Sequence, residues 1–133
     1  MEHDEQLTGG RLNAALADAV VQIHNQYVGR GPSKGQASFR GNVIVVVMED
    51  ALTKAERSLV DAGRGEHVLS MRQEFQRTME DDLIAAVERL TGCKVVAFMS
   101  DNHVDPDMAG ELFVLDRPVP GEVSRNGAGE AAG

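Results

Sequence analysis

The sequence predicts an α+β domain in which two β-hairpins form a four-stranded, mostly antiparallel sheet and three helices pack on it, in the order α-β-β-α-α-β-β. Three observations lead to this fold. Residues 43–48 are six consecutive apolar residues, five of them β-branched, which favours a strand. Shortly after this run, Thr53 and Glu56 have the spacing of a capping box, which begins a helix. Between residues 66 and 90, apolar side chains recur every three or four positions, which indicates a long helix.

The first helix is expected over residues 8–28. The glycines and the proline of residues 29–35 end it, because glycine allows a left-handed exit and proline cannot continue the turn. Residues 36–39 then form a short strand, which a tight connection at 40–42 joins to the strand at 43–48. The apolar positions that define the helix are Leu12, Leu16, Val20, Ile23 and Tyr27.

A brief second helix follows the capping box and ends near Gly63. The third helix, over residues 66–90, is about 37 Å long at 1.5 Å per residue and should overhang strands of about 20 Å. The sequence leaves open whether residues 64–65 separate the two helices or bend a single one. Residues 94–100 and 112–115 form the second hairpin, with a polar turn at 101–110 between them.

The domain is expected to span residues 11–116, between a flexible N-terminus at 1–10 and a disordered tail at 117–133. Three of the four strands are apolar on both faces, so the second face of the sheet needs a cover. Helices divided between the two faces would supply it. A second copy of the chain would also supply it, packed sheet against sheet or through the long helix, and we therefore expect a homodimer.

Composition excludes several classes of protein. The net charge of −8 argues against a nucleic-acid partner, because affinity for phosphates comes from Lys and Arg. Cys93 is the single cysteine, which excludes an internal disulfide and a cysteine-based zinc site. The N-terminus is acidic, and no apolar run approaches the roughly 20 residues that cross a bilayer. We expect a cytoplasmic protein without direct membrane insertion.

The glycine-rich segment 29–35 is the candidate binding site, because backbone N–H groups and basic side chains can hold a small anion such as phosphate or bicarbonate. It does not match a P-loop, since a strand follows it and no Gly-Lys-Ser/Thr closes it. A helix stop with solvated charges is the simpler interpretation. The residues that would bind the anion are Gly29, Arg30, Gly31, Ser33, Lys34 and Arg40.

Other polar residues have structural interpretations. Asp101, His103 and Asp105 form a weak candidate metal site, but the same residue types are what a turn prefers. His24 and His67 have no evident partner and are expected to be structural. The charged residues of the long helix, Arg72 among them, are expected to form a solvated face. No catalytic constellation and no cofactor site is predicted.

Four segments carry a family resemblance: 27–32 with Gly-Arg-Gly-Pro, 52–56 with Leu-Thr-Lys-Ala-Glu, 90–96 followed by Ser100 and Asp101, and 112–115. Together they resemble the MpsC-like domain family, long a domain of unknown function and named after a proposed sodium-translocating, membrane-potential-generating system in bacteria. The resemblance implies a small bacterial cytosolic protein, sometimes encoded beside membrane components for cation or inorganic-carbon transport. It transfers no catalytic residues.

From the residues and the resemblance we expect a non-enzymatic accessory or regulatory protein that acts through protein contacts, with a membrane-transport protein as a partner. The alternative is a small-anion binding or sensing module at residues 29–35.

Overall fold

A computed structural model describes residues 6–29 and 34–121 of the chain. The described residues confirm the predicted α+β fold and its order of elements. In chain order these are α1 (Gly9–Val28), β1 (Lys34–Arg40), β2 (Val43–Glu49), α2 (Lys54–Asp61), α3 (Gly65–Thr91), β3 (Val95–His103) and β4 (Met108–Leu115).

The four strands form one sheet in the order β1-β2-β4-β3, with every neighbouring pair antiparallel. The two most apolar strands, β2 and β4, are therefore central. Gly41 and Asn42 connect β1 to β2, and Gly41 has the positive φ of 61° that a two-residue hairpin turn favours. The turn predicted at 101–110 is too long, because β3 continues to His103 and β4 begins at Met108. The polar residues of this stretch misled the prediction, since an edge strand tolerates outward polar side chains.

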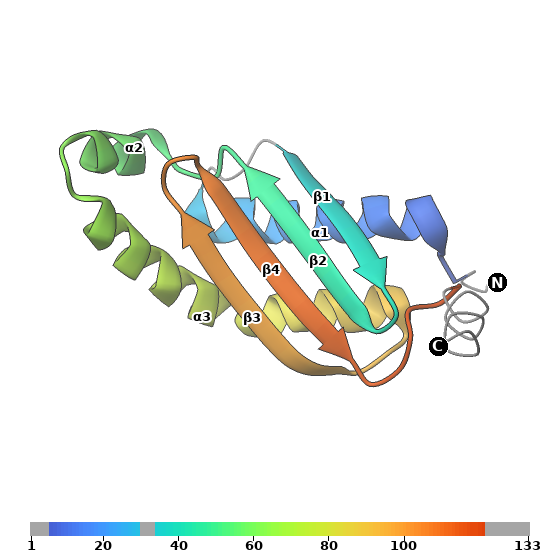
Figure 1. The fold of residues 1–133 in the computed structure, drawn as a ribbon. Helices are drawn as coiled ribbons and strands as arrows, with labels where there is room; N and C mark the ends of the chain where they lie inside the picture. The colour runs from blue at the N-terminus through green and yellow to red at the C-terminus, as the bar shows by residue number, and fades with distance from the viewer. Residues whose placement is uncertain (1–5, 30–33, 122–133) are drawn as a thin grey trace, which may run out of the picture.

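Helices α1 and α3 both lie behind the same face of the sheet, as Figure 1 shows. The core lies between these two helices and the sheet, with contributions from α1, β2, α3 and β4. Of the two covers that the sequence left open, helices divided between the two faces are therefore not found among the described residues. Fully or almost fully buried members of the core include Leu12, Leu16, Val20, Ile44, Val46, Met48, Met79, Leu83, Val87 and Phe113.

The question of one or two helices after the capping box is settled by the structure. Helix α2 ends at Asp61, Gly63 has a positive φ of 82°, and α3 begins at Gly65. Helix α2 and the first turns of α3 lie beyond the end of the sheet in Figure 1, which confirms the predicted overhang.

The opposite side of the sheet carries no helix in the part of the chain described, and we call it the open face (Figure 1). Strand pairing and the alternation of buried residues place the even-numbered residues of β2 in the core and the odd-numbered ones on the open face. The apolar residues of the open face are Val43, Val45, Val47, Ala97, Met99, Met108, Leu112 and Val114.

The two ends of the described chain pack against the domain. Gln6 donates a hydrogen bond from Nε2 to the Leu90 carbonyl (2.8 Å). Val119 is fully buried, and its N–H donates to the Gly41 carbonyl (2.8 Å), so the packed part extends beyond the predicted boundary at 116. Residues 1–5 and 122–133, on which most of the two predicted tails falls, lie outside the described residues.

Candidate functional site

The predicted anion-binding loop falls largely outside the described residues, which lack Arg30, Gly31 and Ser33. Gly29 is the C-cap of α1, and its N–H donates to the Asn25 carbonyl (3.0 Å). Lys34 and Arg40 are the first and last residues of β1, which places them about 20 Å apart. The structure therefore does not bring Arg40 to Lys34.

The weak candidate metal site is not assembled. His103 Nδ1 contacts the Pro106 carbonyl (2.9 Å), and Asp101 Oδ1 accepts a hydrogen bond from the N–H of Asn102 (2.8 Å). Within residues 6–29 and 34–121, no group of three His, Cys, Asp or Glu side chains is placed to hold a metal ion.

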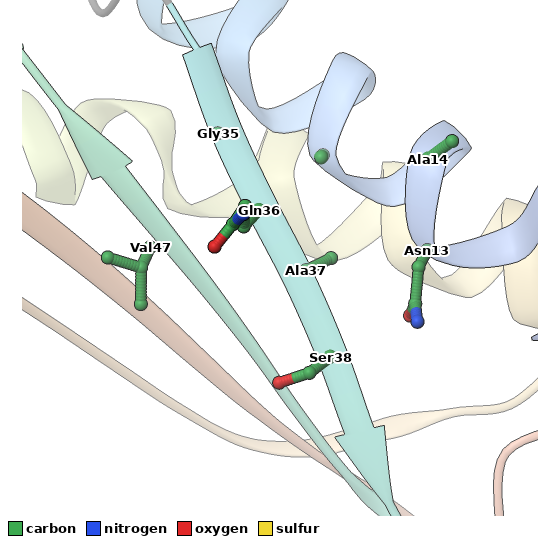
Figure 2. A pocket seen from close by; sticks show the side chains of 8 residues that line it. Asn13, Ala14, Gly35, Gln36, Ala37, Ser38 and Val47 are labelled. Carbon is green, nitrogen blue, oxygen red and sulfur yellow. The ribbon is translucent and has the colours of Figure 1, made fainter. Parts of the chain in front are cut away.

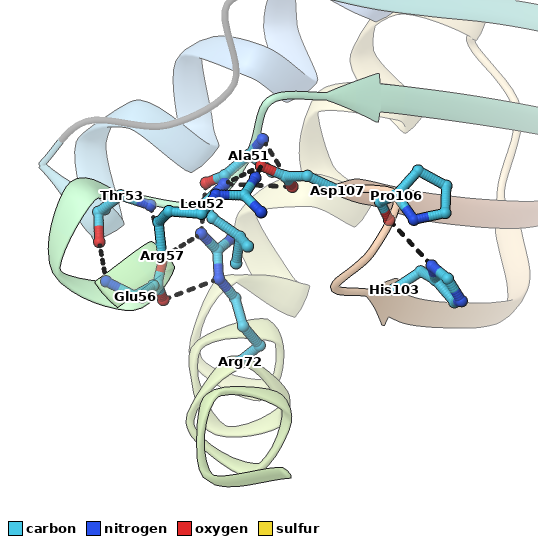
Figure 3. Close-up of polar contacts among 9 residues, drawn as sticks. All are labelled: Ala51, Leu52, Thr53, Glu56, Arg57, Arg72, His103, Pro106 and Asp107. Atoms are coloured by element: carbon cyan, nitrogen blue, oxygen red, sulfur yellow. Dashed lines mark hydrogen bonds and ion pairs between the residues drawn. The ribbon is translucent and has the colours of Figure 1, made fainter. Parts of the chain in front are cut away.

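Asp107, in the turn of the second hairpin, organises the entry to α2 (Figure 3). Its carboxylate accepts hydrogen bonds from the N–H groups of Ala51 (3.1 Å) and Leu52 (3.0 Å) and from Arg57 Nη2 (3.1 Å). The sequence alone does not reveal this role, because the partners lie 50 residues or more away along the chain. The aspartate is occupied by these contacts and is a structural residue.

The predicted capping box is confirmed. Thr53 Oγ1 accepts from the N–H of Glu56 (3.1 Å), and Glu56 Oε1 accepts from the N–H of Thr53 (2.8 Å). Glu56 also receives two hydrogen bonds from Arg72, from Nη2 (2.6 Å) and from Nε (2.9 Å) (Figure 3). Arg72 is 1% exposed and also donates to the Ala51 carbonyl, so its predicted place on a solvated face is wrong.

A second buried polar pair joins α1 to β4. His24 Nε2 lies 2.9 Å from Glu111 Oε2, and both residues are fully buried. Ser100 is paired with Glu111 across β3 and β4 and, with Gln76, lines a pocket of about 320 Å³ between α3 and β3. Ser100 Oγ and Gln76 Nε2 have no hydrogen-bond partner among the described residues. The lining of this pocket includes one cation and one anion, Arg77 and Glu80, so its charge favours neither an anionic nor a cationic ligand.

A pocket of about 360 Å³ lies between α1 and the edge strand β1 (Figure 2). Its lining is dominated by small side chains, among them Ala14, Ala17 and Ala37. Gly35 has a packing role there, because a Cβ at this position would lie 3.0 Å from Val21 Cγ2. The pocket therefore records the close approach of a helix to a strand and offers little chemistry.

The open face is the most distinctive surface of the described chain. Met99, on β3, is 55% exposed, and the valines of β2 that point outward are half-buried. A shallow hollow of about 350 Å³ lies over Gly110, beside Val45, Met99 and Leu112. An apolar surface of this kind is typical of a site of contact with another protein.

None of the helices in the described ranges is long and apolar enough to cross a bilayer. No curated protein and no solved structure matches the chain. A family does match: residues 8–117, most of the chain, fit the one described as the Na⁺-translocating membrane potential-generating system (MpsC). This match over most of the chain identifies it as a member of the MpsC family.

Proposed function

We propose that this chain is a non-enzymatic, cytoplasmic accessory or regulatory protein that works as a homodimer and contacts a membrane protein of a cation or inorganic-carbon transport system. The open face carries the proposal. Keeping a large apolar side chain in water forgoes about 1.5–3 kcal/mol, so a cluster of them is maintained for contact with another surface. The family description, a Na⁺-translocating system, supports the class of partner.

The polar groups support a non-catalytic role. His24 and Glu111 are fully buried, where a substrate cannot reach them. The carboxylate oxygens of Glu56 and Asp107 accept hydrogen bonds from backbone N–H groups and arginines around the start of α2. These acids and bases hold elements together, which is a structural use of groups that an enzyme would present to solvent.

The test is complementation in the native host. The gene is deleted and restored as the wild type, as Met99→Glu on the open face, or as Gln22→Glu on the exposed side of α1 as a matched change of charge. We expect the wild type and Gln22→Glu to restore a Na⁺-dependent membrane potential and Met99→Glu to fail. Cross-linking in cells should recover a membrane protein with the wild type. A deletion that leaves the potential unchanged, with no membrane protein cross-linked, would refute the accessory role.

The second candidate, a small-anion binding or sensing module, is supported by the glycines and basic residues of the loop at 29–35. Phosphate or bicarbonate should raise the melting temperature of the wild type, and Arg30→Ala should abolish that shift. Arg40→Ala is the matched control, since Arg40 lies about 20 Å from Lys34. A shift that survives Arg30→Ala removes this candidate.

A further inference from the structure

We infer that the open face is covered by the same face of a second copy, related by a twofold axis that runs parallel to the strands between β2 and β4. This inference rests on the proposed function and names the occupant and the geometry of its homodimer. The axis places β2 over β4 of the partner subunit and β1 over its β3, because the sheet order is β1-β2-β4-β3.

The shape of the face suits itself in this arrangement. Val47 and Gly110 are paired in register on β2 and β4, so the rotation sets each Val47 opposite Gly110 of the partner subunit. A Cβ added at Gly110 would meet nothing within 4 Å, so the space above this residue is open. Val47 of each copy therefore packs into the hollow over Gly110 of the partner subunit.

Charge selects this axis over the alternatives. Lys34 points to the open face at the β1 edge, and Asp101 points to it at the β3 edge. The axis along the strands sets Lys34 opposite His103 of the partner subunit, two residues along β3 from Asp101 of the partner subunit, which a lysine side chain can reach. An axis across the strands, or edge pairing of β1 with itself about Ala37, would set Lys34 against Arg40 of the partner subunit, and such like-charge pairs are destabilising.

Lys34 is able to form the new contact. Its ion pair with Glu49 within the chain is long, at 4.0 Å, and the two side chains are 72% and 55% exposed. Such a pair constrains the lysine little.

Other occupants fit less well. The outward side of α3 is mostly charged, with exposed Glu74, Asp81 and Arg89, so a dimer through this helix would bury little apolar surface there. Residues 122–133 contain one sizeable apolar residue, Val123, which is too little to cover the face from within the chain. A second copy supplies an apolar surface of equal size and shape.

The size of the face sets the strength of the dimer. Four strands of about seven residues have a flat area of roughly 450 Å² per copy, or about 900 Å² for two. The uneven surface of the side chains adds to this area. Specific interfaces begin near about 1,000–1,200 Å². We therefore expect a dimer that dissociates on dilution.

The experiment is light scattering across a concentration series. The wild type should pass from monomer to dimer. Gly110→Val adds a side chain in open space, so the monomer should stay folded, but it blocks Val47 of the partner subunit. Gly110→Val and Met99→Glu should each weaken the dimer about tenfold or more, while Gln22→Glu changes the dissociation constant less than about twofold. A wild type that stays monomeric, or a dimer indifferent to both variants, overturns the inference.

Charge reversal tests the axis. Lys34→Glu should weaken the dimer, and adding Asp101→Lys should restore it. A dimer that Lys34→Glu tightens uses the axis across the strands or the β1 edge, which overturns the geometry. The two proposals also fail separately. If the wild type is monomeric and still restores the Na⁺-dependent potential, the pairing with a second copy is overturned and the accessory role stands. If the wild type is a dimer and deletion of the gene leaves that potential unchanged, the accessory role is overturned and the dimer stands.

Discussion

The buried pair of Glu56 and Arg72 gives the sharpest prediction for stability. Glu56→Gln keeps an oxygen for the N–H of Thr53 but removes the negative charge that receives two hydrogen bonds from Arg72. Arg72→Met removes the cation and leaves the carboxylate buried, at 4% exposure. We expect each single change to lower the free energy of unfolding strongly and the double change to recover most of the loss.

The magnitude follows from the burial of both groups. The side chain of Arg72 is 2% exposed and that of Glu56 is 5% exposed, so solvent screens the surviving charge very little. Breaking a buried ion pair by removing one partner costs about 3–5 kcal/mol, whereas replacing the whole pair by neutral groups is often nearly neutral. Because the free energy of unfolding of a domain of this size is about 5–15 kcal/mol in total, either single variant should lose a large share of its stability.

The assay is urea denaturation of the wild type, both single variants and the double variant, with the coupling energy taken from the cycle. The exposed pair of Lys34 and Glu49 is the control, and Glu49→Gln should cost less than about 0.5 kcal/mol. The reasoning is refuted if Glu56→Gln costs no more than Glu49→Gln, or if the two single losses simply add in the double variant.

Three further predictions follow from polar contacts. Tyr27 Oη donates to Asp82 Oδ2 (2.5 Å), and this hydrogen bond, with burial and the acidic charges nearby, raises the pKa of Tyr27 above 10.0. The chain has one Tyr and no Trp, so phenolate absorbance should report this pKa directly, and Asp82→Asn should lower it. Because the pKa is raised on folding, the stabilisation is complete below the unfolded pKa and is lost as pH rises through the folded one. Thr53→Ala should cost about 1 kcal/mol in urea denaturation, since it removes the side-chain cap of α2, and no loss would contradict the capping role. Glu111→Ala should cost at least about 2 kcal/mol because His24 stays buried without its partner, and a smaller loss would show that the site readmits water.

The fold could be predicted from the sequence because its signals are local. Six apolar residues at 43–48 are enough to indicate a strand, which the structure places in the centre of the sheet, and Thr53 with Glu56 is enough to begin a helix. The apolar spacing of the long helix predicted its length to within one residue at each end, since it was expected over 66–90 and observed as Gly65–Thr91. These patterns depend on neighbours within one or two turns of the chain.

The polar interior could not be predicted, because its partners are distant in the sequence. Glu111 meets His24 from 87 residues away, and Arg72 meets Glu56 across the gap between two helices. Arg72 carried one available signal: it lies four residues from Val68 and from Gln76, on the buried side of α3. Arg72 was predicted to be exposed because it is charged, although its position indicated the buried side of the helix. An arginine with an ion-pair partner is tolerated in a core.

The distribution of charge bears on how such a protein would reach a membrane. The net charge is −8, and the cytoplasmic surface of a bilayer is itself negative, so direct adsorption would be repelled. The cytoplasmic loops of membrane proteins are rich in Lys and Arg, which gives an acidic protein a surface of opposite charge to meet. Pairing two copies through their open faces would bury the apolar surface, leave both helical layers outside and double the net charge. Under the proposed function, an acidic dimer would therefore be attracted to the basic loops of its transporter partner.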